Sequence, residues 1–243
     1  MSITKCSPSR QTALLGEQVE YTVAQSDEAA EPRIDVGIDG IRVVIPEGSA
    51  ADPRELLAEN AAWVLNKRDK FERYRDTVPD REFVEGALFP YLGDDRELVI
   101  EPRQQSVVTA DAIYLRQSAV SQSSVKTALR NFYQRNARDE FQTRLQTYSD
   151  RMDVTYDSLQ VRNQRTKWGS CSSNGTISLN WRLLMAPEEI VDYVIIHELA
   201  HLEVPDHSEA FWALVAEYDP AYQAHADWLE ENSSQLVFSE EDL

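Results

Sequence analysis

Hydrophobic and polar residues alternate in several short stretches near the N-terminus, which is the pattern of half-buried β-strands. Residues 18–24 alternate in this way, and residues 33–36 and 41–45 flank an Asp39-Gly40 pair that favours a hairpin turn. Residues 1–16 lack this period and are interpreted as a flexible tail. We therefore predict a small, mostly antiparallel sheet that begins after the tail.

A period near 3.6 residues replaces the alternation in two longer stretches. Residues 53–75 are predicted to form the single helix of an N-terminal, β-rich region that spans residues 17–118. Residues 122–147 are predicted to form a long backing helix in a second region, residues 119–232. The acidic residues 233–243 are interpreted as a frayed tail. Short strands are expected between the two helices, at residues 83–92, 97–100, 106–109 and 112–115.

The most informative pattern lies in residues 187–212. Its first half is apolar almost all round a helix, which is typical of a buried helix. The apolar positions are Ile190, Val191, Val194, Ile195, Ile196, Leu199 and Leu202. The exceptions are His197, Glu198 and His201 in the sequence His-Glu-Leu-Ala-His. Buried polar groups need partners, so these three side chains require a common explanation.

A metal ion explains all three side chains. Histidines four residues apart project from one face of a helix and can both bind one tetrahedral zinc ion. Glu198 then lies beside the open position of the metal, where its carboxylate can take a proton from zinc-bound water. The pattern predicts a zinc centre with His197 and His201 as ligands and Glu198 as the catalytic acid and base.

The third ligand follows the end of this helix. Pro205 disfavours helical geometry at Val204, so the chain is expected to turn there and bring His207 back towards the metal. Three protein ligands leave one position for water, as catalytic zinc sites do. Three later carboxylates compete with His207 for this role: Glu209, Glu217 and Glu230. The fourth histidine, His225, is interpreted as part of a surface helix.

Composition and charge narrow the functional classes. The 243 residues carry a formal net charge of −18, which disfavours a general nucleic-acid surface and binding to anionic membranes. Lysine is scarce beside arginine, and an acidic, lysine-poor surface indicates a protein from a halophilic archaeal source. The N-terminal residues have no apolar core long enough for a signal peptide, and the chain has two cysteines and no membrane-length apolar run. A cytoplasmic protein is expected; its oligomeric state is left open.

A local group of basic residues stands out against this acidic background. The group lies on both sides of a strand predicted at residues 176–180 and consists of Arg162, Arg165, Lys167 and Arg182. One interpretation is ordinary ion pairing. The other is that some of them face the metal cleft and bind a substrate carboxylate or phosphate, or stabilise an oxyanion. Residues 176–180 (TISLN) form a predicted strand that could hold an extended peptide if it lies at a sheet edge.

The motifs RNQRTKWGSCS, ISLNWRLLMAPEEIVDYVIIHELAHL and HSEAFW resemble those of the YgjP-like metal-dependent hydrolases, which are distantly related to SprT-like zinc proteases. The resemblance implies an α+β, zincin-like metallopeptidase fold, with zinc on His197, His201 and His207 and Glu198 as the catalytic residue. Val204 stands where metzincin proteases have glycine, which disfavours membership of that group.

We therefore expect a zinc metallohydrolase, in the first place a metalloendopeptidase that acts on polypeptides. Two alternatives stay open. One is a metal-dependent phosphohydrolase that acts on nucleotides, a small-molecule substrate that the basic residues would bind. The other is a DNA-associated protease of the SprT-like kind, which the net charge disfavours.

Overall fold

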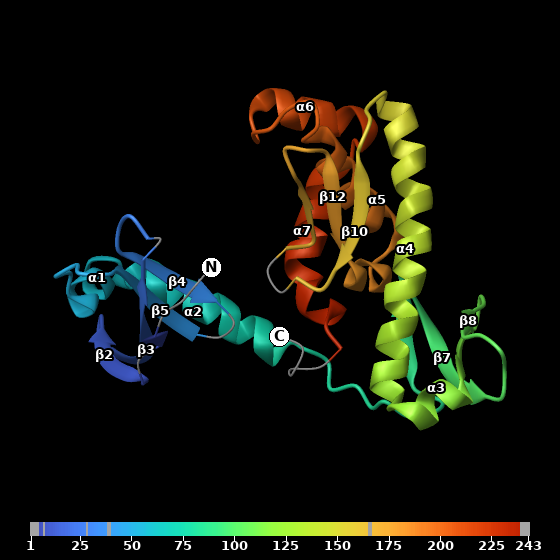
Figure 1. Ribbon diagram of the computed structural model, residues 1–243, viewed down its shortest axis with the longest axis horizontal. Coiled ribbons are helices and arrows are strands. Elements are labelled where there is room, and N and C mark those ends of the chain that lie inside the picture. The colour runs from blue at the N-terminus through green and yellow to red at the C-terminus, as the bar shows by residue number, and fades with distance from the viewer. Residues whose placement is uncertain (1–4, 7, 28, 38–39, 165–166, 239–243) are drawn as a thin grey trace. The chain divides into compact units, whose positions relative to one another are not determined.

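The computed structural model describes residues 5–6, 8–27, 29–37, 40–164 and 167–238 (Figure 1). The chain has the predicted α+β architecture and divides into two compact units. Unit 1 extends to Val78 and unit 2 begins at Pro79. The division falls well before the predicted boundary at residue 118, because the strands after Pro79 pack against the long helix of unit 2.

Unit 1 is built on a five-stranded sheet. Its strands are β1 (Lys5–Cys6), β2 (Arg10–Leu14), β3 (Glu17–Ser26), β4 (Arg33–Gly37) and β5 (Gly40–Pro46). The order is β1-β3-β5-β4, and β2 also pairs with β3. The β3–β5 pair is parallel and the other pairs are antiparallel. The predicted hairpin is the β4–β5 pair, although the turn residues 38–39 lie outside the described residues.

Two helices cover the apolar face of this sheet. Helix α1 (Pro53–Glu59) begins after Asp52, whose carboxylate accepts a hydrogen bond from the Arg54 N–H over 2.8 Å. Helix α2 (Ala61–Asp76) follows Asn60 directly. Their buried side chains, with those of alternate residues on the strands, form the core of unit 1: Val19, Tyr21, Val23, Ile41, Val43, Ile45, Leu57 and Val64.

Two expectations for unit 1 are corrected. Strand β2 lies within residues 1–16, so most of the described part of the expected tail belongs to the sheet. Its pattern was too short to predict a strand without its partner. The single helix expected over residues 53–75 is divided at Asn60, where the backbone leaves helical geometry (φ −109°, ψ 17°).

Unit 2 begins with a four-stranded sheet. Strands β6 (Leu88–Tyr91), β7 (Asp94–Glu101), β8 (Val107–Val108) and β9 (Ala112–Arg116) are arranged in the order β6-β7-β9-β8, with β7 and β9 parallel. All four lie within or overlap the predicted strands. The short helix α3 (Gln117–Gln122) then leads into α4 (Val125–Met152). Helix α4 confirms the predicted backing helix and extends it by five residues at its C-terminal end.

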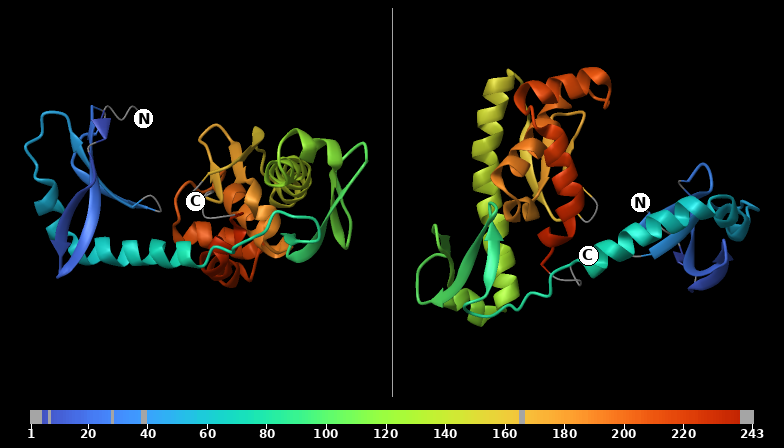
Figure 2. Two further views of the ribbon diagram at one scale, coloured as in Figure 1. Left: turned by 90° about the horizontal axis from the view of Figure 1, so that it is seen from below. Right: turned by 180° about the vertical axis from the view of Figure 1, so that it is seen from behind.

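Helix α4 connects the two sheets of unit 2 (Figures 1 and 2). Its first half lies beside β9 and α3, and its later part lies beside β10 (Ser158–Arg162). Strand β10 pairs in parallel with β12 (Thr176–Asn180), and β12 pairs antiparallel with β11 (Gly169–Cys171). The described residues therefore form three small sheets, one in unit 1 and two in unit 2. Residues 176–180 form the central strand β12, so they do not lie at a sheet edge; the outer strands of this sheet are β10 and β11.

Four helical segments follow β12 in unit 2. The 3₁₀ segment η1 (Trp181–Met185) leads into α5 (Glu188–Ala200), which packs against α4, α6 (Glu209–Tyr218) and α7 (Tyr222–Asn232). Apolar residues on nearly every side of α5 are buried, as predicted, and the helix runs through the interior. No helix among the described residues has both the length and the apolar character needed to cross a bilayer.

The described part of the expected C-terminal tail is corrected as well. Residues Ser233–Leu236 form the 3₁₀ segment η2, and Leu236, Val237 and Phe238 are buried. The guanidinium of Arg81 donates hydrogen bonds to the backbone carbonyls of Gln235 and Val237. The acidic composition of residues 233–243 hid this short apolar run, whose burial depends on aromatic side chains far away in the sequence.

Candidate metal centre

Helix α5 carries the candidate centre. Glu188 and Glu189 lie in its first turn, where carboxylates interact favourably with the positive end of the helix dipole. The helix ends at Ala200, and His201 is its C-cap. The chain then turns as predicted, and the Val204 N–H donates a hydrogen bond to the Ala200 carbonyl over 2.9 Å. This turn returns the chain towards the histidine face of α5.

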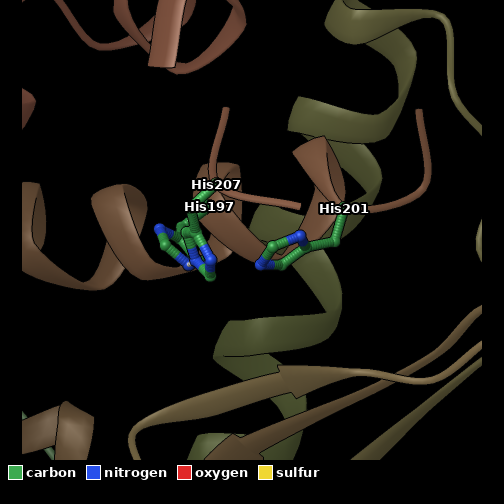
Figure 3. A group of neighbouring side chains, drawn as sticks. All are labelled: His197, His201 and His207. Carbon is green, nitrogen blue, oxygen red and sulfur yellow. Dashed lines mark hydrogen bonds between the residues drawn. The ribbon is translucent and has the colours of Figure 1, made fainter. Parts of the chain in front are cut away.

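The three predicted ligands lie together at this turn. His197, His201 and His207 each offer a nitrogen, and the three nitrogens lie within 4.8 Å of one another. Figure 3 shows the imidazoles converging from the helix and the following turn, and the ring centroids are 4.7–5.1 Å apart. The Nε2 atoms of His197 and His207 are 3.1 Å apart. Segments ten residues apart in the chain are thus brought into reach of a single ion.

Neighbouring groups orient these rings. Nδ1 of His201 lies 3.2 Å from the Val204 carbonyl oxygen, which can only accept a hydrogen bond. This contact requires a proton on Nδ1 and leaves the lone pair of Nε2 for a metal. The buried ring of Phe211, on α6, lies 4.5–4.9 Å from all three imidazoles and stacks on that of His201. Phe211 thus restricts the rotation of the three ligands.

The donor set fits a divalent transition metal. Three neutral imidazoles are a common ligand set for catalytic zinc. With Zn–N bonds of about 2.05 Å, two ligands of a tetrahedral ion lie about 3.4 Å apart. The observed 3.1 Å between the Nε2 atoms of His197 and His207 is close to this ligand–ligand distance. Burial, and then the charges of His201 and His207, lower the pKa of His197 to about 4, so its ring is neutral at pH 7 as a ligand must be.

Glu198 lies next to this group on the same helix. Its side chain is 5% exposed, and one carboxylate oxygen, Oε2, has no hydrogen-bond partner among the described residues. Burial raises the pKa of Glu198 to about 7, although Lys167 and the backbone N–H of Cys171 oppose the shift. A carboxyl with a pKa near neutrality can both accept and donate a proton at pH 7.

The histidines and Glu198 line one cleft of about 660 Å³. Strand β11 and the turn that follows it form the opposite wall. This wall is polar except at Gly169 and Cys171, and Lys167 is its one cation among the described residues. The cleft is lined by Lys167, Gly169, Ser170, Cys171, Ser172, Ser173, His197, Glu198, His201, Leu202, Pro205 and His207.

A family model described as a YgjP-like, metallopeptidase domain matches residues 30–232. The chain belongs to the YgjP-like metallopeptidase family. This membership confirms the resemblance found in the sequence and supports a metal-dependent peptidase.

Two solved structures are similar to part of this YgjP-like metallopeptidase. The metallopeptidase zymogen abylysin of Pyrococcus abyssi is 26% identical, with a TM-score of 0.37, and the match covers 39% of this chain and 96% of that one. The zymogen jannalysin of Methanocaldococcus jannaschii is 17% identical, with a TM-score of 0.35, and the match covers 38% and 96%. No curated protein matches the chain.

The described members of the predicted basic group, Arg162, Lys167 and Arg182, are not brought together in the cleft. Lys167 lines it, but Arg162 is exposed on β10 and donates a hydrogen bond to Gln160. Arg182 is buried in η1, and its guanidinium carbon lies 5.7 Å from the centroid of the Trp181 ring. Arg165 lies outside the described residues. Of the three described members of the predicted group, only Lys167 can meet a substrate in the cleft.

The structure also places the competing carboxylates, the fourth histidine and three serines of the cleft. The competing carboxylates Glu209, Glu217 and Glu230 do not join the metal-binding group found among the described residues. His225, expected on the surface, is half-buried and its Nδ1 lies 2.8 Å from Asp219 Oδ2. Ser170, Ser172 and Ser173 line the cleft without having been predicted as site residues, although they stand in and directly after the motif RTKWGSCS.

Proposed function

We propose that the chain is a zinc-dependent endopeptidase that cleaves polypeptides with water and uses Glu198 as its proton carrier. The observation that carries this proposal is the convergence of His197, His201 and His207 beside a buried glutamate on one cleft. A purely structural zinc site would need neither an open cleft nor a buried carboxylate with a free oxygen.

The metal, when bound by the three histidines, would polarise the scissile carbonyl and make water acidic enough to attack it at neutral pH. Glu198 accepts the proton of the attacking water. It then passes this proton to the amide nitrogen as the C–N bond breaks, which yields a carboxylate and an amine. A pKa of about 7 equips the same carboxyl for both steps.

The opposite wall of the cleft provides a means of holding an extended substrate. Strand β11 lies at one end of the β10-β12-β11 sheet, so one of its backbone edges has no partner strand among the described residues. A polypeptide can add to such an edge through main-chain hydrogen bonds. Lys167, just before β11, would bind a substrate carboxylate or stabilise the oxyanion that forms on the attacked carbonyl.

The nucleotide alternative is less well supported. A triphosphate needs several cations or metal-held contacts, and Lys167 is the one cation that lines the described part of the cleft. The net charge of −18 likewise disfavours a general DNA-binding role.

The proposal is tested with metal-free protein that is reloaded with one equivalent of zinc. An unfolded protein such as casein and nucleoside triphosphates are offered in parallel to the reloaded chain and to the metal-free chain. We expect fragments of casein from the zinc-loaded chain only, with internal cleavage sites identified by mass spectrometry. Hydrolysis of the triphosphates without cleavage of casein would instead support the phosphohydrolase.

A further inference from the structure

The first residue of β11, Gly169, packs against the carboxyl group of Glu198. A Cβ atom added to Gly169 would lie 2.7 Å from Cγ and 2.8 Å from Cδ of Glu198, and closer still to Oε1. Carbon atoms in van der Waals contact are about 3.5–4.0 Å apart. Any side chain at position 169 would therefore displace this carboxyl group.

The conformation of the backbone does not explain the glycine. Gly169 is not among the described glycines with a positive φ, so its backbone geometry is open to other residues. The need for glycine comes from the space that Glu198 occupies.

The strand itself has little freedom to move away. Gly169 pairs with Leu179 and Cys171 pairs with Ile177, and both partners are fully buried in the core of unit 2. The backbone N–H of Cys171 also donates a hydrogen bond to the Glu198 carboxylate. Because β11 is fixed, a side chain at position 169 would move the flexible end of Glu198 and leave the strand in place.

We propose that Gly169 is a positioning residue: the absence of a side chain there lets β11 hold the Glu198 carboxyl group at the place from which it transfers protons. This inference rests on the proposed function, because it assumes that Glu198 carries the proton. It gives the Trp-Gly-Ser-Cys part of the sequence motif a role that metal binding does not require.

The kinetic test is the substitution Gly169→Ala in the zinc-loaded chain. Displacement of a catalytic group by about 1 Å can cost on the order of 100-fold in rate. We expect kcat for casein or a derived peptide to fall by about this factor, with KM and the zinc content unchanged. Gly37→Ala is the matched control, because a Cβ at this other strand glycine would meet nothing within 4 Å; its kcat should equal that of the wild type.

A second test needs no activity. The thermal unfolding of the metal-free chain is measured for the wild type, Gly169→Ala, Glu198→Ala and the double variant. If the added methyl group collides with Glu198, Gly169→Ala lowers Tm by about 3 °C in the background that keeps Glu198. In the Glu198→Ala background the carboxyl group is gone, so the same change leaves Tm unaltered or raises it. Should Gly169→Ala fail to fold, the double variant should fold.

The outcomes separate the two proposals. Equal changes of Tm in both backgrounds, or a double variant that also fails to fold, would overturn the role of Gly169. An unchanged kcat in Gly169→Ala, while Glu198→Gln is inactive, would overturn it and leave the proposed function intact. If the zinc-loaded wild type cleaves no polypeptide, the proposed function fails, and the unfolding experiment still decides whether Gly169 positions Glu198.

Discussion

The Nε2 atoms of His197 and His207 lie 3.1 Å apart, although ten residues and the end of a helix separate the two side chains in sequence. Two neutral imidazoles at this distance share at most one hydrogen bond, whereas a cation between them satisfies both lone pairs. His201 completes the group with its Nε2 left free by the contact of Nδ1 with Val204. The turn at Pro205 therefore positions His207, as the helix positions His197 and His201.

Removal of His207 tests the part of the site that lies outside the helix. His207→Ala should weaken zinc binding by more than about 100-fold, since changes in outer-shell partners alone cost 10–100-fold. The affinity is measured by competition with a chromophoric chelator. His225→Ala is the control, because His225 pairs with Asp219 and is not part of the metal-binding group. Equal affinities in the two variants would remove His207 from the ligand set.

Replacement of Glu198 by glutamine separates proton transfer from metal binding. Glu198→Gln keeps the size of the side chain but cannot accept the proton, so kcat should fall by about 100- to 10,000-fold. Zinc content by elemental analysis should stay at one equivalent per chain. Wild-type turnover in this variant would exclude Glu198 as the proton carrier.

The packing of the backing helix on the metal-binding helix depends on Arg144. Its guanidinium, 14% exposed, donates hydrogen bonds to Glu188 and Asp192 of α5 at 2.8 and 2.7 Å, and to Glu140 one turn earlier on α4. Arg144→Met leaves two partly buried carboxylates without this partner, Glu140 and Asp192. We expect a loss of about 1–3 kcal/mol in the free energy of unfolding, between the values for surface and buried pairs.

The matched control for Arg144 is Arg33→Met, which removes an exposed pair with Asp35. Chemical denaturation monitored by circular dichroism should show little change for this variant. A similar effect of both substitutions would mean that Arg144 acts as an ordinary surface charge.

The C-terminal residues Leu236 to Phe238 are buried in the core of unit 2. The fully buried Phe238 lies 5.0–6.1 Å, between ring centroids, from the four aromatic residues Phe83, Phe89, Tyr133 and Trp181. Phe238→Ala should lower the free energy of unfolding by about 3–5 kcal/mol. Val84→Ala, at a half-exposed position in the same unit, should change it by less than about 0.5 kcal/mol. Similar values for the two would indicate a frayed segment.

The sequence revealed those features that depend on local spacing. The apolar faces of α4 and α5 and the positions of His197, Glu198 and His201 follow from helical geometry. His207 could be added because Pro205 limits where the chain can go next. In each case the interacting residues are within about three helical turns of one another in sequence.

Features that depend on distant partners were not predictable in this way. Strand β12 is central because β10 and β11 happen to pair with it on both sides, and its own sequence does not say so. The run Leu236 to Phe238 reads as part of an acidic tail until the aromatic pocket that receives it is known. Likewise, nothing around Arg182 indicates that its charge is buried beside Trp181 instead of facing the cleft.

The burial of α5 has a consequence for attempts to redesign this catalyst. Residues on almost every side of that helix contact the interior, so substitutions made there to alter selectivity would disturb folding first. Ser170, Ser172 and Ser173 line the opposite wall and none is buried, although Ser172 Oγ accepts a hydrogen bond from the Thr176 N–H over 3.0 Å. Libraries that vary Ser170 and Ser173 should therefore change selectivity with less loss of folded protein than libraries that vary α5.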